Sequence, residues 1–246
     1  RAALYERPED LVTDPASGTP LGRQCTNGSI EPWPARRELE ASGELEGTEL
    51  VYVRDDLDAY TIQVNGSARL RMDDGELMYI GYAGKTDQPY TGLGHSVLDA
   101  GLIPEDKLSL RAIRRLYDKN PEQVNNLIAN NASYVFFREY NGGNWPAGSL
   151  GVPVTAERSI ATDKKIFPRG GVVLVDTTVR SLTGEKQTFT QFMTDQDTGG
   201  AIRAPGRADL FMGVGPTAGI KAGGQYAEGQ LYYLFLKPNS IAIVQE

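Results

Sequence analysis

The chain has 246 residues, of which 40% are hydrophobic and 23% are charged, as in an ordinary folded globular protein. Its formal net charge of −7 argues against a nucleic-acid partner, because such proteins present a basic face to phosphate groups. One histidine and one cysteine cannot form the usual His/Cys zinc sites or an internal disulfide. No apolar run approaches the roughly 18 residues of a membrane span. We therefore expect no metal, no cofactor and no transmembrane segment.

The N-terminal half is predicted to mix strands and helices. Residues 1–34 are rich in proline and glycine and are predicted as loops, followed by a short helix over 35–42. Alternating apolar and polar side chains predict four strands, over residues 49–54, 59–65, 68–72 and 77–82. Three helices are predicted next, over residues 93–100, 110–119 and 122–129, and then a strand over 134–138. The acidic run at 55–58 lacks the glycine and glutamate of a calcium loop, so we interpret it as a solvated turn.

The C-terminal half is predicted to be almost entirely β. Residues 141–148, NGGNWPAG, form the strongest linker pattern, so we expect one domain over 1–147 and another over 148–246. Beyond the linker, strands are predicted over residues 159–162, 172–177, 188–194, 208–212, 231–237 and 241–244. Short strands joined by glycine turns favour a small closed barrel, with a helix indicated only near 218–223. The expected fold class is mainly β with some α.

Asp197 and Asp209 are the first candidates for chemistry. They lie at predicted strand ends, twelve positions apart, and turns at Gly199-Gly200 and Pro205-Gly206 separate them. Arg203 and Arg207 lie between them, and carboxylates among cations and apolar neighbours are where acid–base groups acquire shifted pKa values. The alternative is that both aspartates only cap turns. The other general-base candidate, His95, lies on the predicted exposed first turn of a helix without a supporting partner, so we expect no catalytic role for it.

Several ordered motifs resemble the membrane-bound lytic murein transglycosylase A family, whose C-terminal domain is named for three aspartates. The resemblance covers nearly the whole chain, from about residue 4 to residue 237. Asp197 begins DTGGAI, Asp209 begins DLF, and GVGPTAG follows over residues 213–219. Asp163 lies in ATDKKIFPRG. Upstream, the matching segments are VNGSARL at 64–70, GYAGK at 81–85, Pro89-Tyr90 and SYVFFR at 133–138.

The resemblance implies a fold and a reaction. Residues 148–246 would form a double-psi β-barrel, and residues 1–147 an inserted mixed α/β domain that forms one wall of a glycan groove. The reaction would cleave the β-1,4 bond between N-acetylmuramic acid and N-acetylglucosamine, leaving a 1,6-anhydromuramic acid end. Asp209 would be the single acid/base, with Asp197 and Asp163 lining the site. The implied glycan-binding residues are Asn65, Ser67, Tyr82, Lys85, Tyr90 and Arg203, although core packing is an equal alternative for the two tyrosines.

The resemblance also implies a setting for the protein. Its partners would be peptidoglycan glycan strands, at the outer membrane or in the periplasm, with no nucleic acid involved. It leaves room for a lipid anchor on sequence outside this chain and for partners among cell-wall enzymes. Family members carry an N-terminal segment with a glycine-tyrosine-tyrosine-glutamate-proline motif that supplies part of the barrel, and this chain begins after it. A truncated or processed chain, or a barrel completed by another chain, is therefore expected. The alternative function is a glycan-binding or scaffold module with little activity.

Overall fold

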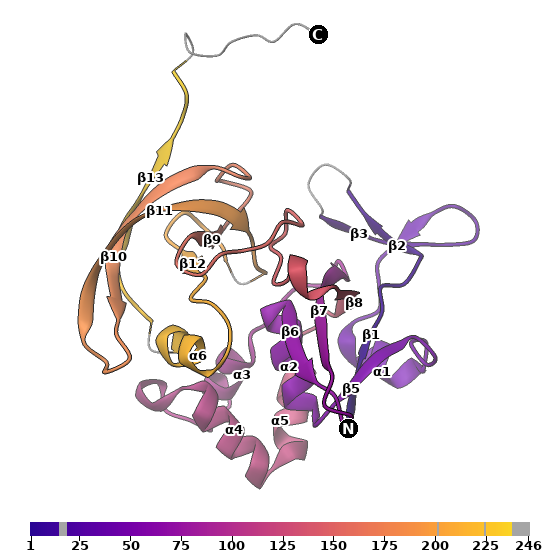
Figure 1. Cartoon of the computed structure of the whole chain (residues 1–246). Helices are drawn as coiled ribbons and strands as arrows, with labels where there is room; N and C mark the ends of the chain where they lie inside the picture. The colour runs from indigo at the N-terminus through magenta and orange to yellow at the C-terminus, as the bar shows by residue number, and fades with distance from the viewer. Residues whose placement is uncertain (15–18, 201, 224, 238–246) are drawn as a thin grey trace, which may run out of the picture. The chain divides into compact units, whose positions relative to one another are not determined.

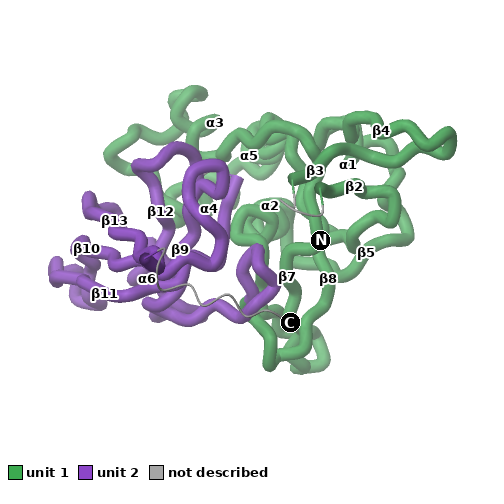
Figure 2. Tube along the Cα trace, turned by 90° about the horizontal axis from the view of Figure 1, so that it is seen from above, with its two compact units in different colours: residues 1–146 green, residues 147–246 purple. Residues whose placement is uncertain are grey.

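The structure, a computed structural model, describes residues 1–14, 19–200, 202–223 and 225–237. The chain divides into two compact units, Arg1–Pro146 and Ala147–Glu246 (Figures 1 and 2). Each unit has its own hydrophobic core, and the two are described separately below.

The described residues of unit 1 form five helices and three small antiparallel sheets, of strand order β1-β5, β2-β3-β4 and β6-β7-β8 (Figure 1). Its strands are β1 (Ala2–Tyr5), β2 (Leu11–Thr13), β3 (Pro20–Gln24), β4 (Ile30–Glu31), β5 (Glu49–Val53), β6 (Ser67–Arg71), β7 (Leu77–Lys85) and β8 (Val135–Tyr140). Its helices are α1 (Arg36–Ser42), α2 (Asp56–Asn65), α3 (Leu93–Asp99), α4 (Leu110–Lys119) and α5 (Pro121–Ile128). Short 3-10 turns occupy Glu105–Lys107 and Gly142–Asn144.

Residues 1–34 are rich in loops, but four short strands, β1 to β4, also lie there, and the sequence did not predict them. The glycines in this region serve strand pairing as well as turns. Gly22 lies in β3 with a φ of +136°, and a Cβ at this position would lie 2.4 Å from the carbonyl oxygen of Glu31. Only glycine lets the two backbones approach so closely.

The strand predicted over residues 59–65 is wrong, because this segment belongs to helix α2. The Asp55 side chain caps the helix by accepting a hydrogen bond from the Asp58 amide at 2.9 Å, and Gly66 ends it in the left-handed conformation. Leu57 and Tyr60 then pack into the helical core of the unit. Capping and burial together outweigh the β-branched residues that favoured a strand.

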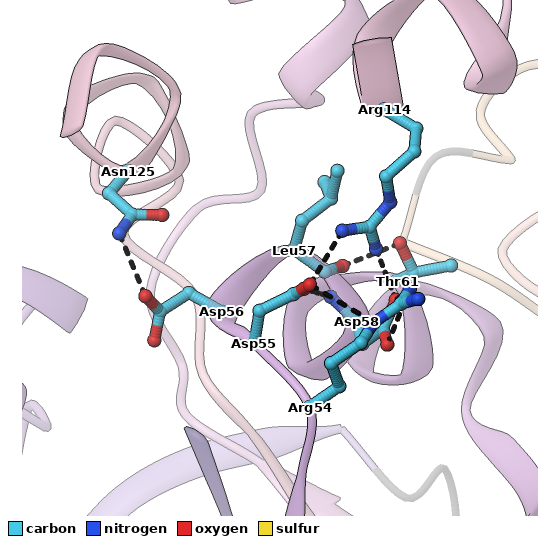
Figure 3. Close-up of polar contacts among 8 residues, drawn as sticks. All are labelled: Arg54, Asp55, Asp56, Leu57, Asp58, Thr61, Arg114 and Asn125. Atoms are coloured by element: carbon cyan, nitrogen blue, oxygen red, sulfur yellow. Dashed lines mark hydrogen bonds and ion pairs between the residues drawn. The ribbon is translucent and has the colours of Figure 1, made fainter. Parts of the chain in front are cut away.

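The acidic run at the start of α2 is not a solvated turn, because its side chains bind other elements (Figure 3). Arg114 of α4 donates to Asp55 at 2.7 Å and also contacts Asp58. The Asn125 amide of α5 donates to Asp56 at 2.7 Å. Arg54 pairs with Asp55 and Asp58 from the exposed side, at 3.2 and 3.0 Å. These contacts tie the start of α2 to two other helices.

The part of unit 2 that the structure describes is a single curled sheet with one α-helix beside it. Its elements are β9 (Ser159–Thr162), β10 (Val172–Arg180), β11 (Lys186–Asp197), β12 (Ala208–Leu210), α6 (Pro216–Gly223) and β13 (Gly229–Leu234). The strand order is β12-β9-β11-β10-β13, with β9 parallel to β11 and the other pairs antiparallel. Figure 1 shows β10 and β11 as long, strongly bent strands, so the sheet forms a half-barrel. The strand predicted over 241–244 lies outside the described residues.

One face of this sheet forms the core of unit 2. Ile160, Val173, Val175, Phe189 and Met193 are all buried there. They come from the three interior strands, where period-two alternation directs every second side chain inward. The predicted strands of this half were therefore placed correctly over 159–162 and 172–177, although β10 and β11 continue beyond their predicted ends.

We predict that Arg114→Ala destabilises unit 1 by about 1–3 kcal/mol, because it removes charge-assisted hydrogen bonds made by a side chain that is only 25% exposed. Arg54→Ala is the matched control, since Arg54 contacts the same two aspartates from a side chain that is 69% exposed. We expect it to cost less than about 0.5 kcal/mol. Urea unfolding of the three proteins measures both values, and equal losses would show that Arg114 has no special role.

Candidate active site

The candidate site is organised by a β-bulge in β11. Asp195 pairs with Ile160 of β9, but the next paired residue of β11 is Asp197, which pairs with Ala161. Gln196 is therefore an extra residue without a partner on β9. Side chains two positions apart on a regular strand share a face, and one extra residue cancels that relation. Asp195 consequently faces the core, whereas Asp197 faces the opposite side of the sheet.

The same side of the sheet also carries Asp209. Strands β11 and β12 lie on opposite sides of β9. Asp197 of β11 and Asp209 of β12 both pair with Ala161 of β9, so the three residues form one row across three strands. Directly paired residues project from the same face. Neighbouring strands lie about 4.8 Å apart, which puts the Cα atoms of the two aspartates roughly 10 Å from one another. Asp163 follows Ala161 by two positions, at the end of β9.

Asp163 is a buried carboxylate with two backbone donors. Its Oδ1 accepts from the Lys165 amide at 3.0 Å, and its Oδ2 accepts from the Ala204 amide at 3.0 Å. The Lys165 amide, the Ala204 amide and the nearby Arg203 together lower the pKa of Asp163. Ala204 has a φ of +69°, an unfavourable conformation for alanine. Asp163 thus holds the strained turn that leads into β12.

Asp197 has the opposite electrostatic environment. Burial raises its pKa, and the carboxylate of Asp195 adds to this, whereas backbone amides and Lys164 act against it. The Ser149 amide donates to Asp197 Oδ1 at 2.9 Å. The preceding residue, Gly148, has no room for a side chain, since a Cβ there would lie 2.5 Å from the Gln196 carbonyl oxygen. The loop before β9 therefore covers Asp197 closely.

Asp209 is the most accessible of the three predicted aspartates. Its side chain is 52% exposed, and Arg207 donates to it through Nε at 3.2 Å and through Nη2 at 3.4 Å. Arg203, the sixth predicted glycan-binding residue, is exposed and donates from Nε to the Gly200 carbonyl at 3.0 Å. Arg207 therefore pairs with Asp209, whereas the printed contact of Arg203 is with the turn before β12.

A buried polar cluster beneath this face was not predicted from the sequence. Asp195 is fully buried, and its Oδ2 accepts from Thr162 Oγ1 and from the Tyr233 hydroxyl, each at 2.6 Å. Lys164 forms an ion pair with Asp195 Oδ1 and donates to Thr162 Oγ1 at 2.9 Å. A sequence signal for Asp195 does exist. Phe189 and Met193 face the core, and Asp195 is an even number of positions from both, so alternation along the strand predicts a charged side chain in the core.

The other predicted glycan-binding residues lie in unit 1. Asn65 ends α2 and is exposed, Ser67 begins β6, and Tyr82 of β7 is 39% exposed. These three come together around Gly66, whose carbonyl accepts from the Tyr82 amide at 2.7 Å. Lys85 ends β7, and Tyr90 precedes α3. Tyr82 is partly exposed, although burial raises the pKa of its hydroxyl group to about 12, so glycan binding by this residue stays a prediction.

Across the described residues, no group of three or more His, Cys, Asp or Glu side chains is arranged to hold a metal ion. In the same part of the chain, no helix has the length and apolar character needed to cross a bilayer.

Comparison with known proteins identifies the family. Residues 1–138 match the family model of the MltA specific insert domain, and residues 158–235 match that of the 3D domain. Membrane-bound lytic murein transglycosylase A of Vibrio cholerae is 30% identical over 239 residues, which cover 95% of this chain and 62% of the relative. A crystal structure of a membrane-bound lytic murein transglycosylase from Agrobacterium tumefaciens matches with a TM-score of 0.80 and 31% identity. The match covers 95% of this chain and 67% of the Agrobacterium chain.

A crystal structure of Escherichia coli MltA with bound chitohexaose also matches, with a TM-score of 0.71 and 26% identity. This match covers 94% of this chain and 68% of the Escherichia coli chain. The chain therefore belongs to the membrane-bound lytic murein transglycosylase A family. The predicted fold class, a mainly β protein with a barrel and an inserted domain, is confirmed by these structures. The chain spans 62% of the length of the Vibrio relative.

The contrasting environments of Asp163 and Asp197 predict opposite effects on stability. The pKa of Asp163 is lowered, so its ionised form stabilises the fold above about pH 4, and this stability is lost as the pH falls through the lowered pKa. Asp163→Asn should therefore lower the unfolding free energy at pH 7. The pKa of Asp197 is raised, so the wild type loses stability as the pH rises from about 4 through that pKa.

Asp197→Asn removes this charge and should be at least as stable as the wild type at pH 7, with the difference vanishing below about pH 4. Urea unfolding at pH 3.5, 5 and 7 measures these effects. A larger loss of stability at pH 7 for Asp197→Asn than for Asp163→Asn would contradict the assigned environments.

Proposed function

We propose that this protein is a murein lytic transglycosylase, which cleaves the β-1,4 bond between N-acetylmuramic acid and N-acetylglucosamine. The observation that carries the proposal is the row Asp197–Ala161–Asp209, which puts two carboxyl groups of unlike environment on one face of the 3D domain. Membership of the lytic transglycosylase A family supports the reaction class. The glycan complex of the Escherichia coli relative supports a chain of N-acetylated sugars as the ligand.

In the proposed reaction Asp209 acts first as acid and then as base. Its proton passes to the glycosidic oxygen, the bond from that oxygen to C1 of the muramic acid residue breaks, and N-acetylglucosamine leaves with a free hydroxyl group. The C6 hydroxyl oxygen of the same muramic acid then bonds to C1, and its proton passes to Asp209. No water is consumed, and the attacking group has the advantage of an intramolecular nucleophile.

The surroundings of Asp209 suggest what glycan binding must do. Arg207 donates to both carboxyl oxygens, and those oxygens must be free for one of them to carry a proton. The Arg207 side chain is 50% exposed and can turn away when a sugar occupies the face. We propose that Asp197 and Asp163 have supporting roles, with Asp163 holding the turn before β12 and Asp197 contacting the sugar.

We also propose that three residues of unit 1 around Gly66 contact glycan, together with Lys85 and Tyr90. They are the exposed Asn65 and Tyr82 and the half-buried Ser67. An exposed tyrosine beside polar groups suits a pyranose ring, which has an apolar face and hydroxyl groups at its rim. The names of the relatives, membrane-bound murein transglycosylases, support action at the cell envelope where murein lies. This setting gives the protein peptidoglycan as its partner.

The test is the reaction of Asp209→Asn with purified murein. We expect a loss of cleavage of at least about a hundredfold, the usual contribution of a general acid, with glycan binding retained. Asp176→Asn is the matched control, since Asp176 is an exposed aspartate on β10 of the same sheet, and it should keep full activity. Mass spectrometry of wild-type products should show 1,6-anhydro ends, lighter by one water than hydrolytic ends.

Two outcomes would replace this proposal. Incorporation of labelled oxygen from solvent water into the new ends would identify a hydrolase that uses two carboxyl groups. Binding of murein by the wild-type protein without any cleavage would identify a glycan-binding or scaffold module.

A further inference from the structure

Arg36, the first residue of helix α1, is a buried arginine that the proposed reaction does not use. It is 2% exposed, and its guanidinium carbon lies 4.6 Å from the centre of the Tyr134 ring. Its carboxylate partner, Glu40, binds at 3.1 Å through a side chain that is 46% exposed. Because burying a guanidinium is costly unless its N–H groups are hydrogen-bonded, its other partners indicate what the residue does.

Arg36 binds one short segment, residues 131–133, which connects α5 to β8. Its Nε donates to the carbonyl oxygen of Asn131 at 3.0 Å, and its Nη2 donates to that of Ser133 at 2.9 Å. The backbone amide of Arg36 donates to the carbonyl between them, that of Ala132, at 2.9 Å. The donors of a guanidinium are fixed in one plane, so these bonds determine both the place and the orientation of the segment.

The same segment holds the backbone on both sides of Tyr90, one of the predicted glycan-binding residues. The Ser133 amide donates to the Pro89 carbonyl at 3.1 Å. Asn131 Oδ1 accepts from the Thr91 amide, also at 3.1 Å. Asn131 and Ser133 are both buried, so water does not compete for these bonds. The position of Tyr90 therefore follows from the position of residues 131–133.

A second branch of contacts leads from Arg36 to the end of helix α2. Nη2 of Arg36 also donates to Gln63 Oε1, and Gln63 is buried. Gln63 lies two positions before Asn65, the last residue of α2, and the helix ends at Gly66. The Gly66 carbonyl in turn accepts from the Tyr82 amide at 2.7 Å. One buried side chain thus connects the two parts of unit 1 that carry predicted glycan-binding residues.

We propose that Arg36 is a positioning residue for glycan binding. It fixes Tyr90 through residues 131–133 and the turn at Gly66 through Gln63, so that both are held in place before the glycan arrives. Arg36 is buried and does not touch the sugar. A glycan that contacts both parts binds more weakly when either of them must first be ordered, because the ordering entropy is then lost on binding. This inference rests on the proposed function for the identity of the ligand.

A purely structural role for Arg36 makes a different prediction, and Arg114 is the matched control. Arg114 also ties helix α2 to another helix, through Asp55 and Asp58 at the opposite end of α2. Its removal is predicted above to destabilise unit 1, and its hydrogen bonds involve neither residues 89–91 nor the end of α2. If Arg36 matters only for stability, variants of the two arginines should affect glycan binding alike.

The test is calorimetric titration of the whole chain with chitohexaose. Arg36→Lys keeps the charge, but one ammonium nitrogen cannot reach the acceptors that the guanidinium binds through separate nitrogen atoms. We expect it to weaken binding by at least about fivefold, with the fold retained in urea unfolding. Arg114→Ala should bind as the wild type does. Unchanged binding in Arg36→Lys, or equal weakening in both variants, would overturn the proposal.

A second variant leaves the buried charge in place. Asn131→Ala removes the acceptor of the Thr91 amide but keeps the backbone carbonyl that Arg36 binds. It should weaken chitohexaose binding in the wild type and have no further effect in a Tyr90→Ala background, because two residues that act through one contact are not additive. Additive losses in the double variant would show that Asn131 does not act through Tyr90 and would contradict the proposal.

These measurements separate the inference from the proposed reaction. If the chain cleaves murein and Arg36→Lys binds chitohexaose as the wild type does, the reaction stands and the role of Arg36 is wrong. If the chain does not cleave murein and the binding losses appear as expected, the reaction fails and the role of Arg36 stands in a glycan-binding module. Absence of chitohexaose binding by the wild type would overturn the role of Arg36, whatever the outcome of the murein digestion.

Discussion

Where β11 pairs with β9, it contains one extra residue, Gln196, and the arrangement of the site depends on this β-bulge. Without it, Asp195 and Asp197 would share a face, and two carboxyl groups would be driven together into the core. With it, one aspartate is enclosed with a lysine and the other joins Asp209 across Ala161. Two contacts fix the bulge. The Ser159 hydroxyl donates a hydrogen bond to Gln196 Oε1 at 2.6 Å, and the backbone of Gly148 packs against the Gln196 carbonyl oxygen.

A consequence of this arrangement is that identical side chains acquire different chemistry. Asp163 has two backbone donors that lower its pKa, Asp197 is desolvated and has a raised pKa, and Asp209 faces solvent beside Arg207. Each environment follows from backbone placement: a strand end, a bulge and an edge strand. The sheet thus differentiates three equivalent residues without any change in their covalent structure.

The sequence predicted the interior strands of unit 2 and the helix over residues 110–119 because each has a clear apolar period and usable caps. It could not predict the bulge, since strict alternation puts Asp195 and Asp197 on the same face, and Asp195 was therefore overlooked as a core residue. Helix α2 was misassigned because its cap at Asp55 resembled part of a turn, and its contact with Arg114 comes from a residue 59 positions away. Such long-range contacts leave no local trace in a sequence.

Strand β12 has a further consequence for Asp209. This strand has three paired residues, and in the part of the chain that the structure describes its partner, β9, lies on one side only. Asp195 and Asp197 are carried by an interior strand with neighbours on both sides. Local opening is cheapest where few backbone bonds and little buried surface are lost. Asp209, the proton donor of the proposed reaction, therefore lies on a short edge segment that can separate from the sheet together with its partner Arg207, without unfolding the domain.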